Sequence, residues 1–167
     1  MPLTHAYINE QLTAHLSEKL IAWEESYGMA SATVQADHNL KTLTFLHDEP
    51  SLGFQFMTDI TAVHYPDRKG EELAVVYHLH NLVENIRLRI KVFVPVASPN
   101  VYTATGLFSG ANWMERETFD FYGVNFIGHP DLRRVLNVDE MDYFPLRKEY
   151  PLEDQTRIDK DDEMFGR

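Results

Sequence analysis

Cysteine is absent from this chain of 167 residues. The chain can therefore form no disulfide, offers no thiolate to an iron–sulfur cluster, and has no cysteine nucleophile. Basic residues are also scarce, with 15 lysines and arginines against 26 acidic residues and a formal net charge of -11. That charge argues against a nucleic-acid backbone or an anionic membrane surface as the main partner.

Long hydrophobic runs are missing as well. No apolar stretch approaches the roughly 18 residues that can span a bilayer, and the start of the chain lacks the basic and apolar regions of a secretory signal. We expect a cytoplasmic chain that is soluble on its own, which leaves open that it belongs to a membrane-attached assembly. Its hydrophobic share of 44% and charged share of 25% are ordinary for a globular domain.

Hydrophobic periodicity predicts an α+β protein, with a mixed, mainly antiparallel sheet of four to five strands flanked by helices and an extended C-terminal tail. Apolar residues every three or four positions up to Tyr27 indicate the first helix, which Gly28 would end. Asp37-His38-Asn39 is typical of a hairpin turn. The expected elements are, in chain order, a helix over 8–27, strands over 31–36 and 40–46, a short helix starting at Asp48, and strands over 58–65, 73–82 and 86–94.

The middle of the chain has the strongest strand signal. Alternate residues are apolar in 73–82 and 86–94, and a tight connection at 83–85 predicts that these strands form an antiparallel pair. His78 and His80 share the polar face of the first strand, at a spacing that can bind a metal. No third ligand is suggested nearby, so two solvated histidines on the outer face is the favoured interpretation.

Arg87, Arg89 and Lys91 line the polar face of the strand over 86–94, and we call them the basic stripe. In an otherwise acidic chain, such a stripe could bind an acidic partner. It could equally protect an edge strand, because charged side chains on an edge prevent pairing with another chain. The sequence leaves both interpretations open.

Residues 112–136 combine more charged and aromatic side chains than a loop or a core segment usually holds. Asn112 with Glu115 three positions later predicts a helix start with a reciprocal cap, and Gly123 suits the cap at the other end, about three turns on. Pro130 could begin a second, short helical turn. The segment should therefore fold as two short elements held together by charged side chains.

The charges allow two chemical interpretations. Glu115, Glu117 and His129 could form an acid–base set or a carboxylate–histidine metal site. The chain has no nucleophile elbow, phosphate loop or other metal-ligand pattern, however. A network of salt bridges around Arg116 and Asp120 that locks the helix to the following loop is favoured.

Two sequence motifs in this region are more specific signals than its overall composition. The first consists of Glu115, Arg116, Glu117, Asp120, Gly123, Phe126, Gly128, His129, Pro130, Asp131, Leu132, Arg133 and Arg134. The second includes Arg147, Lys148 and Tyr150, with Glu149 where an aspartate is more usual. Together, over residues 112–152, they resemble the signature of the C subunit of proton-pumping NADH:quinone oxidoreductase, respiratory complex I.

The resemblance implies a non-catalytic structural subunit of the hydrophilic arm, without a cofactor or metal of its own. Its partners would be the larger, quinone-site D subunit and neighbouring cluster-bearing subunits at the cytoplasmic face of the cell inner membrane, and FMN, iron–sulfur clusters and quinone would belong to those chains. The motif residues would then form an interface. One alternative is the equivalent subunit of a related membrane-bound hydrogenase or NDH-type complex. The other is a freestanding soluble enzyme that uses Glu115, Glu117 and His129.

The C-terminal part differs in character from the rest. Residues 137–167 hold ten acidic and five basic residues, a net charge of -5, with few aliphatic side chains. Such a composition should not form a core of its own. We expect one α+β domain over 1–136 and an extended acidic tail over 137–167 that wraps on partner subunits.

Overall fold

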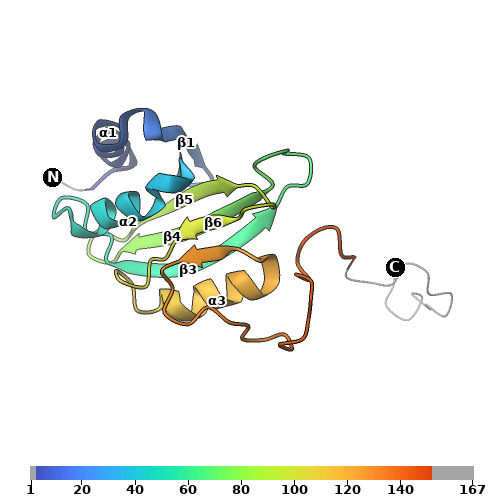
Figure 1. Cartoon of the computed structure of the whole chain (residues 1–167). Helices are drawn as coiled ribbons and strands as arrows, with labels where there is room; N and C mark the ends of the chain where they lie inside the picture. Colours follow the sequence, from blue (N-terminus) through green and yellow to red (C-terminus); the bar gives the residue numbers. More distant parts are fainter. Residues whose placement is uncertain (1–2, 152–167) are drawn as a thin grey trace, which may run out of the picture.

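The computed structural model describes residues 3–151. Within them, three α-helices and seven strands are joined mostly by short turns (Figure 1). No helix in this part of the chain is long and apolar enough to cross a membrane. The elements are, in order, α1 (His5–Leu16), η1 (Ser17–Lys19), β1 (Leu20–Ser26), β2 (Met29–Val34), η2 (Ala36–His38), α2 (Asn39–Asp48), β3 (Phe56–His64), β4 (Leu73–Asn81), β5 (Ile86–Val94), β6 (Asn100–Tyr102), α3 (Ala111–Tyr122) and β7 (Asn125–Ile127).

Five of the strands form one sheet in the order β1-β2-β5-β4-β3. Every neighbouring pair is antiparallel except β2 and β5, which run parallel. Strands β6 and β7 form a separate parallel pair. The α+β class and the mixed, mainly antiparallel sheet are therefore confirmed, as is the expected antiparallel pairing of β4 with β5.

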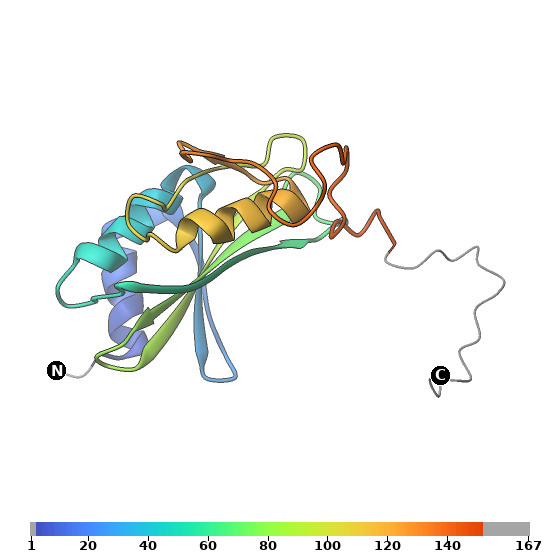
Figure 2. The ribbon, with the colours of Figure 1, turned by 90° about the horizontal axis from the view of Figure 1, so that it is seen from below.

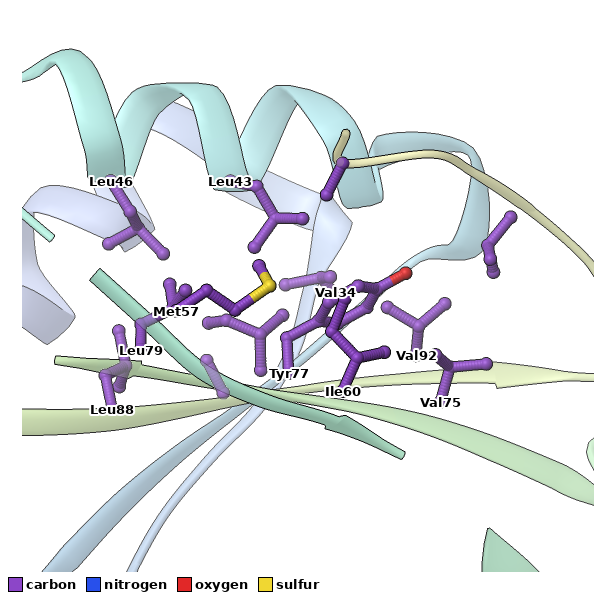
Figure 3. Close-up of a cluster of buried hydrophobic side chains, with 14 of the residues drawn as sticks. Val34, Leu43, Leu46, Met57, Ile60, Val75, Tyr77, Leu79, Leu88 and Val92 are labelled. Carbon is purple, nitrogen blue, oxygen red and sulfur yellow. The ribbon is translucent and has the colours of Figure 1, made fainter. Parts of the chain in front are cut away.

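The hydrophobic core lies between one face of the sheet and the helices. Helices α2 and α3 both lie along that face (Figure 2), and α1 packs beside α2 with the rings of His15 and Phe45 stacked 3.9 Å apart. In the core, Leu43 of α2 lies above Tyr77 of β4, among side chains from β2, β3 and β5 (Figure 3). Burying one large apolar side chain contributes about 1.5–3 kcal/mol, so this layer holds the fold together.

The first helix is shorter than predicted. It ends at Leu16, where Ser17 takes a positive φ of 49°, and the chain continues as β1. Tyr27 and Gly28, with φ of 53° and 74°, form the hairpin turn between β1 and β2 and not a helix cap. Trp23 kept the helical spacing but packs on the core from a strand, because pairing with β2 overrides the local pattern.

The run over 40–46, predicted as a strand, belongs to α2. The buried residues of this helix recur at helical spacing and are Asn39, Thr42, Leu43 and Leu46. The predicted hairpin turn is the short helix η2, and Asp48 ends a helix where it was expected to begin one. The threonines at 42 and 44 favour strands by propensity, and tertiary packing overrides that preference.

Strand β5, which carries the basic stripe, is the central strand of the sheet. The stripe therefore does not protect an edge, and that interpretation is wrong. The neighbouring histidines are not a solvated pair either. His80 is buried and hydrogen-bonds to Asn85, whereas His78 is partly buried and accepts a hydrogen bond from Arg89.

Helix α3 packs along β3, one of the two edge strands of the sheet. The Thr118 hydroxyl lies 3.1 Å from the Ile60 carbonyl of β3 and 2.8 Å from the Met114 carbonyl of its own helix, so its proton is available to either. The helix that carries the first motif thus also contacts one edge strand of the sheet.

Candidate functional site

Both motifs lie on α3 and on the loop over 123–151 that returns along it (Figures 1 and 2). Apart from β7, this loop has no helix or strand, and the helical turn predicted after Pro130 is absent. Such a loop has few backbone ladders to satisfy its polar groups, so side chains must supply the hydrogen bonds that hold it.

Asp120 is the centre of that network and has no solvent-exposed surface. Its Oδ2 accepts hydrogen bonds from the backbone N–H groups of Val135, Leu136 and Asn137 at 3.0, 2.8 and 2.9 Å. Its Oδ1 accepts from Arg134 Nη1 at 2.7 Å and from the side-chain amide of Asn137 at 3.0 Å. The carboxylate therefore fixes the loop at one point against α3.

Arg134 extends the network to more distant parts of the loop. Its Nη2 donates to the carbonyls of Met141 at 2.7 Å and Tyr143 at 2.9 Å. Its guanidinium also lies 5.2 Å from the centroid of the Phe144 ring. One cation thus links the end of α3 to the segment that leads into the second motif.

The environment of Asp120 strongly favours its charged form. Burial by itself raises the pKa of this carboxyl, but the hydrogen bonds from the amides of Asn137 and Leu136 and from Arg134 outweigh burial. The pKa of Asp120 therefore lies well below its usual range. The side chain is ionised at every physiological pH, which is the form that its five donors stabilise.

The predicted cap of α3, formed by Asn112 and Glu115, is absent. The cap position is Gly110, and the fully buried Glu115 points inward instead. Its carboxylate accepts hydrogen bonds from the Ala104 N–H at 2.6 Å and the Thr103 hydroxyl at 2.5 Å. Burial raises the pKa of Glu115 to about 7, although these two hydrogen bonds partly oppose the shift. The group therefore changes its charge close to neutral pH.

Arg116 holds the loop at a second point. It is buried, and its Nε and Nη2 donate to the backbone carbonyls of Arg133 and Arg134, both at 3.3 Å. Its guanidinium carbon also lies 4.7 Å from the ring centroid of Trp113, which is within the range of a cation–π contact. The indole of Trp113, 63% exposed, is thereby held against the protein surface.

His129 fixes the turn before the arginine pair. Its Nδ1 accepts the Asp131 N–H at 3.0 Å, so the ring proton lies on Nε2, which donates to the Asn112 carbonyl at 3.1 Å. Gly128, with φ of 86°, makes the turn possible. The Asp131 carboxylate pairs at 2.9 Å with Arg133 on the exposed side of the turn.

Gly123 ends α3 in the left-handed conformation, with φ of 76°, as the sequence predicts. A Cβ at this position would lie 2.5 Å from the Phe144 ring and 2.6 Å from Arg147 Nη2. Arg147 also donates from Nε to the Tyr122 carbonyl at 2.7 Å. The second motif therefore packs directly on the glycine that ends the first helix.

The rest of the second motif contacts the sheet domain as well. The Lys148 N–H donates to His64 Nδ1 at the end of β3, at 3.0 Å. The rings of Tyr150 and Tyr143 lie 4.9 Å apart. Residues 137–151 thus lie on the chain's own domain, while residues 152–167 of the predicted tail are outside the described residues.

We expect Gly123→Ala to lower the free energy of unfolding by about 2 kcal/mol, because the side chain would be strained at positive φ and would meet Phe144 and Arg147. Urea denaturation followed by circular dichroism measures the loss. Gly106→Ala is the matched control, because a Cβ there meets nothing within 4 Å. An equal loss in both variants would show that the contact at Gly123 is unimportant.

The three residues of the acid–base hypothesis are not joined. Glu115 is buried against Thr103 and Ala104, Glu117 is exposed, and both ring nitrogens of His129 are occupied by backbone groups. No hydrogen bond within residues 3–151 connects any two of them. The same part of the chain contains no group of three His, Asp or Glu side chains that could hold a metal ion. The geometry therefore gives the enzyme hypothesis no support.

Several residues of the network were not predicted. Thr103 and Ala104 hold Glu115, and His64 binds the second motif across 84 positions of sequence. Val135 and Leu136 contribute only backbone N–H groups, which no side-chain pattern can reveal. Asn137 carried a detectable signal, because Asn is a frequent turn residue.

The chain is similar to members of one known protein family. Residues 32–156 match the family described as "Respiratory-chain NADH dehydrogenase, 30 Kd subunit". The C subunit of NADH-quinone oxidoreductase from Methylorubrum populi is 40% identical over 157 residues, which cover 93% of this chain and 71% of the relative. The same subunit from Rhizobium rhizogenes is 43% identical over 156 residues, covering 91% and 77%.

Two solved structures have a similar fold. A trypsin-resistant fragment of Nqo5 superposes with a TM-score of 0.64 at 29% identity, covering 75% of this chain and 98% of the fragment. A chain of the membrane-bound sulfane sulfur reductase, an archaeal respiratory membrane complex, has a TM-score of 0.73 at 24% identity over 88% of this chain and 85% of its own, and shares the fold. The motifs, the fold and the close relatives lead to one conclusion: this chain belongs to the 30-kDa subunit family of respiratory-chain NADH dehydrogenase.

Proposed function

We propose that this chain is a non-catalytic structural subunit in the hydrophilic arm of an NADH:quinone oxidoreductase. That complex passes electrons from NADH through FMN and iron–sulfur clusters to quinone and couples the transfer to proton translocation. The observation that carries the proposal is the network around Asp120. Within residues 3–151, its buried charges are engaged by groups of the same chain that hold a loop in place.

The proposed partners are the quinone-site D subunit and neighbouring cluster-bearing subunits, at the cytoplasmic face of the inner membrane. FMN, clusters and quinone belong to those chains in this proposal, in keeping with a sequence that has no thiolate to offer. The network leaves some motif side chains exposed, and Trp113, Glu117 and Arg133 are available for contacts between subunits. Glu117 has no ion pair within residues 3–151, so its carboxylate can pair with a cation of a partner subunit.

Purification of the tagged chain from membranes in a mild detergent tests this function. We expect it to migrate with a large assembly that contains FMN and iron–sulfur clusters and oxidises NADH. A chain that migrates alone under these conditions, or that turns over a substrate in isolation, would contradict the proposal. Blue-native electrophoresis with an NADH activity stain separates these outcomes.

We further propose that residues 152–167, with six acidic and three basic residues, bind partner subunits. Truncation after Pro151 is expected to lower the amount of assembled complex without changing the thermal unfolding of the isolated chain, because the contacts of residues 137–151 remain. A full-length chain with the order of residues 152–167 scrambled is the matched control for charge and length. Assembly of the truncated chain at the wild-type yield would exclude this role.

A further inference from the structure

The second face of the sheet carries several charged side chains among small polar and apolar ones, whereas the first face carries the hydrophobic core. The strand register places Glu24, Ser31, Arg89, His78 and Asp59 in one row across all five strands. The helices pack on the other face (Figure 2). In the middle of the open face lies the basic stripe, which the proposed function does not use.

Arg89 is held in position from one side only. Its Nε donates to His78 Nε2 at 3.0 Å, which fixes the plane of the guanidinium. Its two terminal nitrogens, Nη1 and Nη2, make no hydrogen bond to any group within residues 3–151. A guanidinium with both terminal nitrogens free is suited to bind a carboxylate through two parallel hydrogen bonds. Within residues 3–151, Arg89 therefore lacks the anionic partner of an ion pair.

His78 supports this geometry only while it is neutral, because a protonated ring could not accept the hydrogen bond from Arg89. Burial and the adjacent Arg89 cation lower the pKa of His78, whereas Asp59, 3.8 Å away, raises it less. The net direction keeps the ring in the accepting form at neutral pH. The anchor for Arg89 is therefore present under physiological conditions.

The two other cations of the stripe, Arg87 and Lys91, lie on either side of Arg89 along β5. Arg87 is exposed and has no ion pair within residues 3–151, whereas Lys91 reaches Glu24 at 3.2 Å. Along a strand, side chains two positions apart are separated by about 6.6 Å. Acidic side chains at alternate positions of an extended segment have the same spacing. The positive charge of the stripe and the spacing of its side chains therefore match an extended segment with acidic side chains at alternate positions.

We propose that the open face of the sheet, through Arg87 and Arg89, binds an extended acidic segment of a neighbouring subunit, with a carboxylate on the free side of the Arg89 guanidinium. This inference rests on the proposed function, because it requires an assembly. The chain's net charge of -11 makes a local cationic surface the natural contact for an acidic partner. Edge protection, the other interpretation of the stripe, is excluded by the central position of β5 in the sheet.

Photo-crosslinking in the purified assembly tests the proposal. Benzoylphenylalanine replaces Tyr27, an exposed aromatic side chain near Arg87, in the full chain, so that both arginines are kept. The assembly is purified in mild detergent, and the crosslinked peptides are identified by mass spectrometry. We expect a crosslink to an acidic segment of another subunit, and Arg89→Gln in the same background should reduce its yield about tenfold. Lys41→Gln, which removes one exposed positive charge on α2, is the matched control and should leave the yield unchanged.

The outcomes distinguish this proposal from the proposed function. Crosslinks only to residues 152–167 of the same chain, only to non-acidic segments, or none at all in an intact assembly would overturn the proposal alone. A chain that fails to purify with any assembly would instead overturn the proposed function. Thermal unfolding of the isolated variants verifies that Arg89→Gln still folds, and Arg89→Lys, which keeps the charge but not the paired donors, should give an intermediate yield.

Discussion

Replacing Asp120 with alanine is expected to lower the free energy of unfolding by about 4 kcal/mol, because one partner of a buried ion pair is removed. Arg134, whose side chain is only 9% exposed, would lose its carboxylate. The N–H groups of Val135, Leu136 and Asn137 would lose their acceptor at the same time. Urea denaturation at pH 7, followed by circular dichroism, measures the difference.

Asp131→Ala is the control for that experiment. Its ion pair with Arg133 is exposed, at 55% and 69% of the two side chains, and exposed pairs contribute about 1 kcal/mol or less. A loss at position 120 no greater than at position 131 would contradict the central role of the buried carboxylate. The stabilisation by Asp120 also depends on pH. Its folded-state pKa is depressed, so the stabilisation is complete above the unfolded value of 3.8 and decreases as acid protonates the group in the folded chain.

The stability of the wild-type chain is expected to fall by about 3 kcal/mol between pH 4 and pH 8 relative to Glu115→Gln. The pKa of Glu115 is raised from 4.5 to about 7 by burial, so the folded chain binds this proton more tightly than the unfolded chain. The stabilisation that the proton provides is complete below 4.5 and is lost as the pH rises through 7. Urea denaturation at half-unit pH intervals measures both curves.

Glutamine is the informative replacement at this position. Its amide oxygen can accept the Ala104 N–H, and its NH2 can donate to the Thr103 hydroxyl, so both hydrogen bonds are preserved without a titrating group. Glu10→Gln, at an exposed position of α1, is the control and should leave the pH dependence unchanged. Parallel curves for the wild-type chain and Glu115→Gln would show that Glu115 is already ionised in the folded chain near pH 5.

The sequence predicted the elements whose signal is local. Alternation identified β4 and β5, and Gly123 marked the end of α3 because glycine adopts its left-handed conformation without strain. The boundary between α1 and β1 was missed because Trp23 satisfies a helical and a strand pattern equally well. Helix α2 was missed because threonines in its middle favour a strand in the absence of tertiary contacts.

For the site, the sequence identified which residues matter but not how they pair. Asp120 and Arg134 were both expected to be paired, but no spacing rule selects Asp120 over Glu117 as the partner of Arg134, because the loop between them follows no regular period. The inward direction of Glu115 depends on Thr103, which approaches from a different part of the fold. Contacts of this kind join different elements of the fold, so no local sequence pattern predicts them.

The packing of α3 along β3 has a consequence for the chain before it meets its partners. A subunit that is made separately exists for a time without its partners. Two such copies could pair through an open sheet edge. Helix α3 packs along the edge strand β3, where Thr118 reaches the Ile60 carbonyl, and the opposite edge strand β1 carries a register shift near Leu20 and two glutamates. Both features reduce the free strand edge with which a second copy of the unassembled chain could pair.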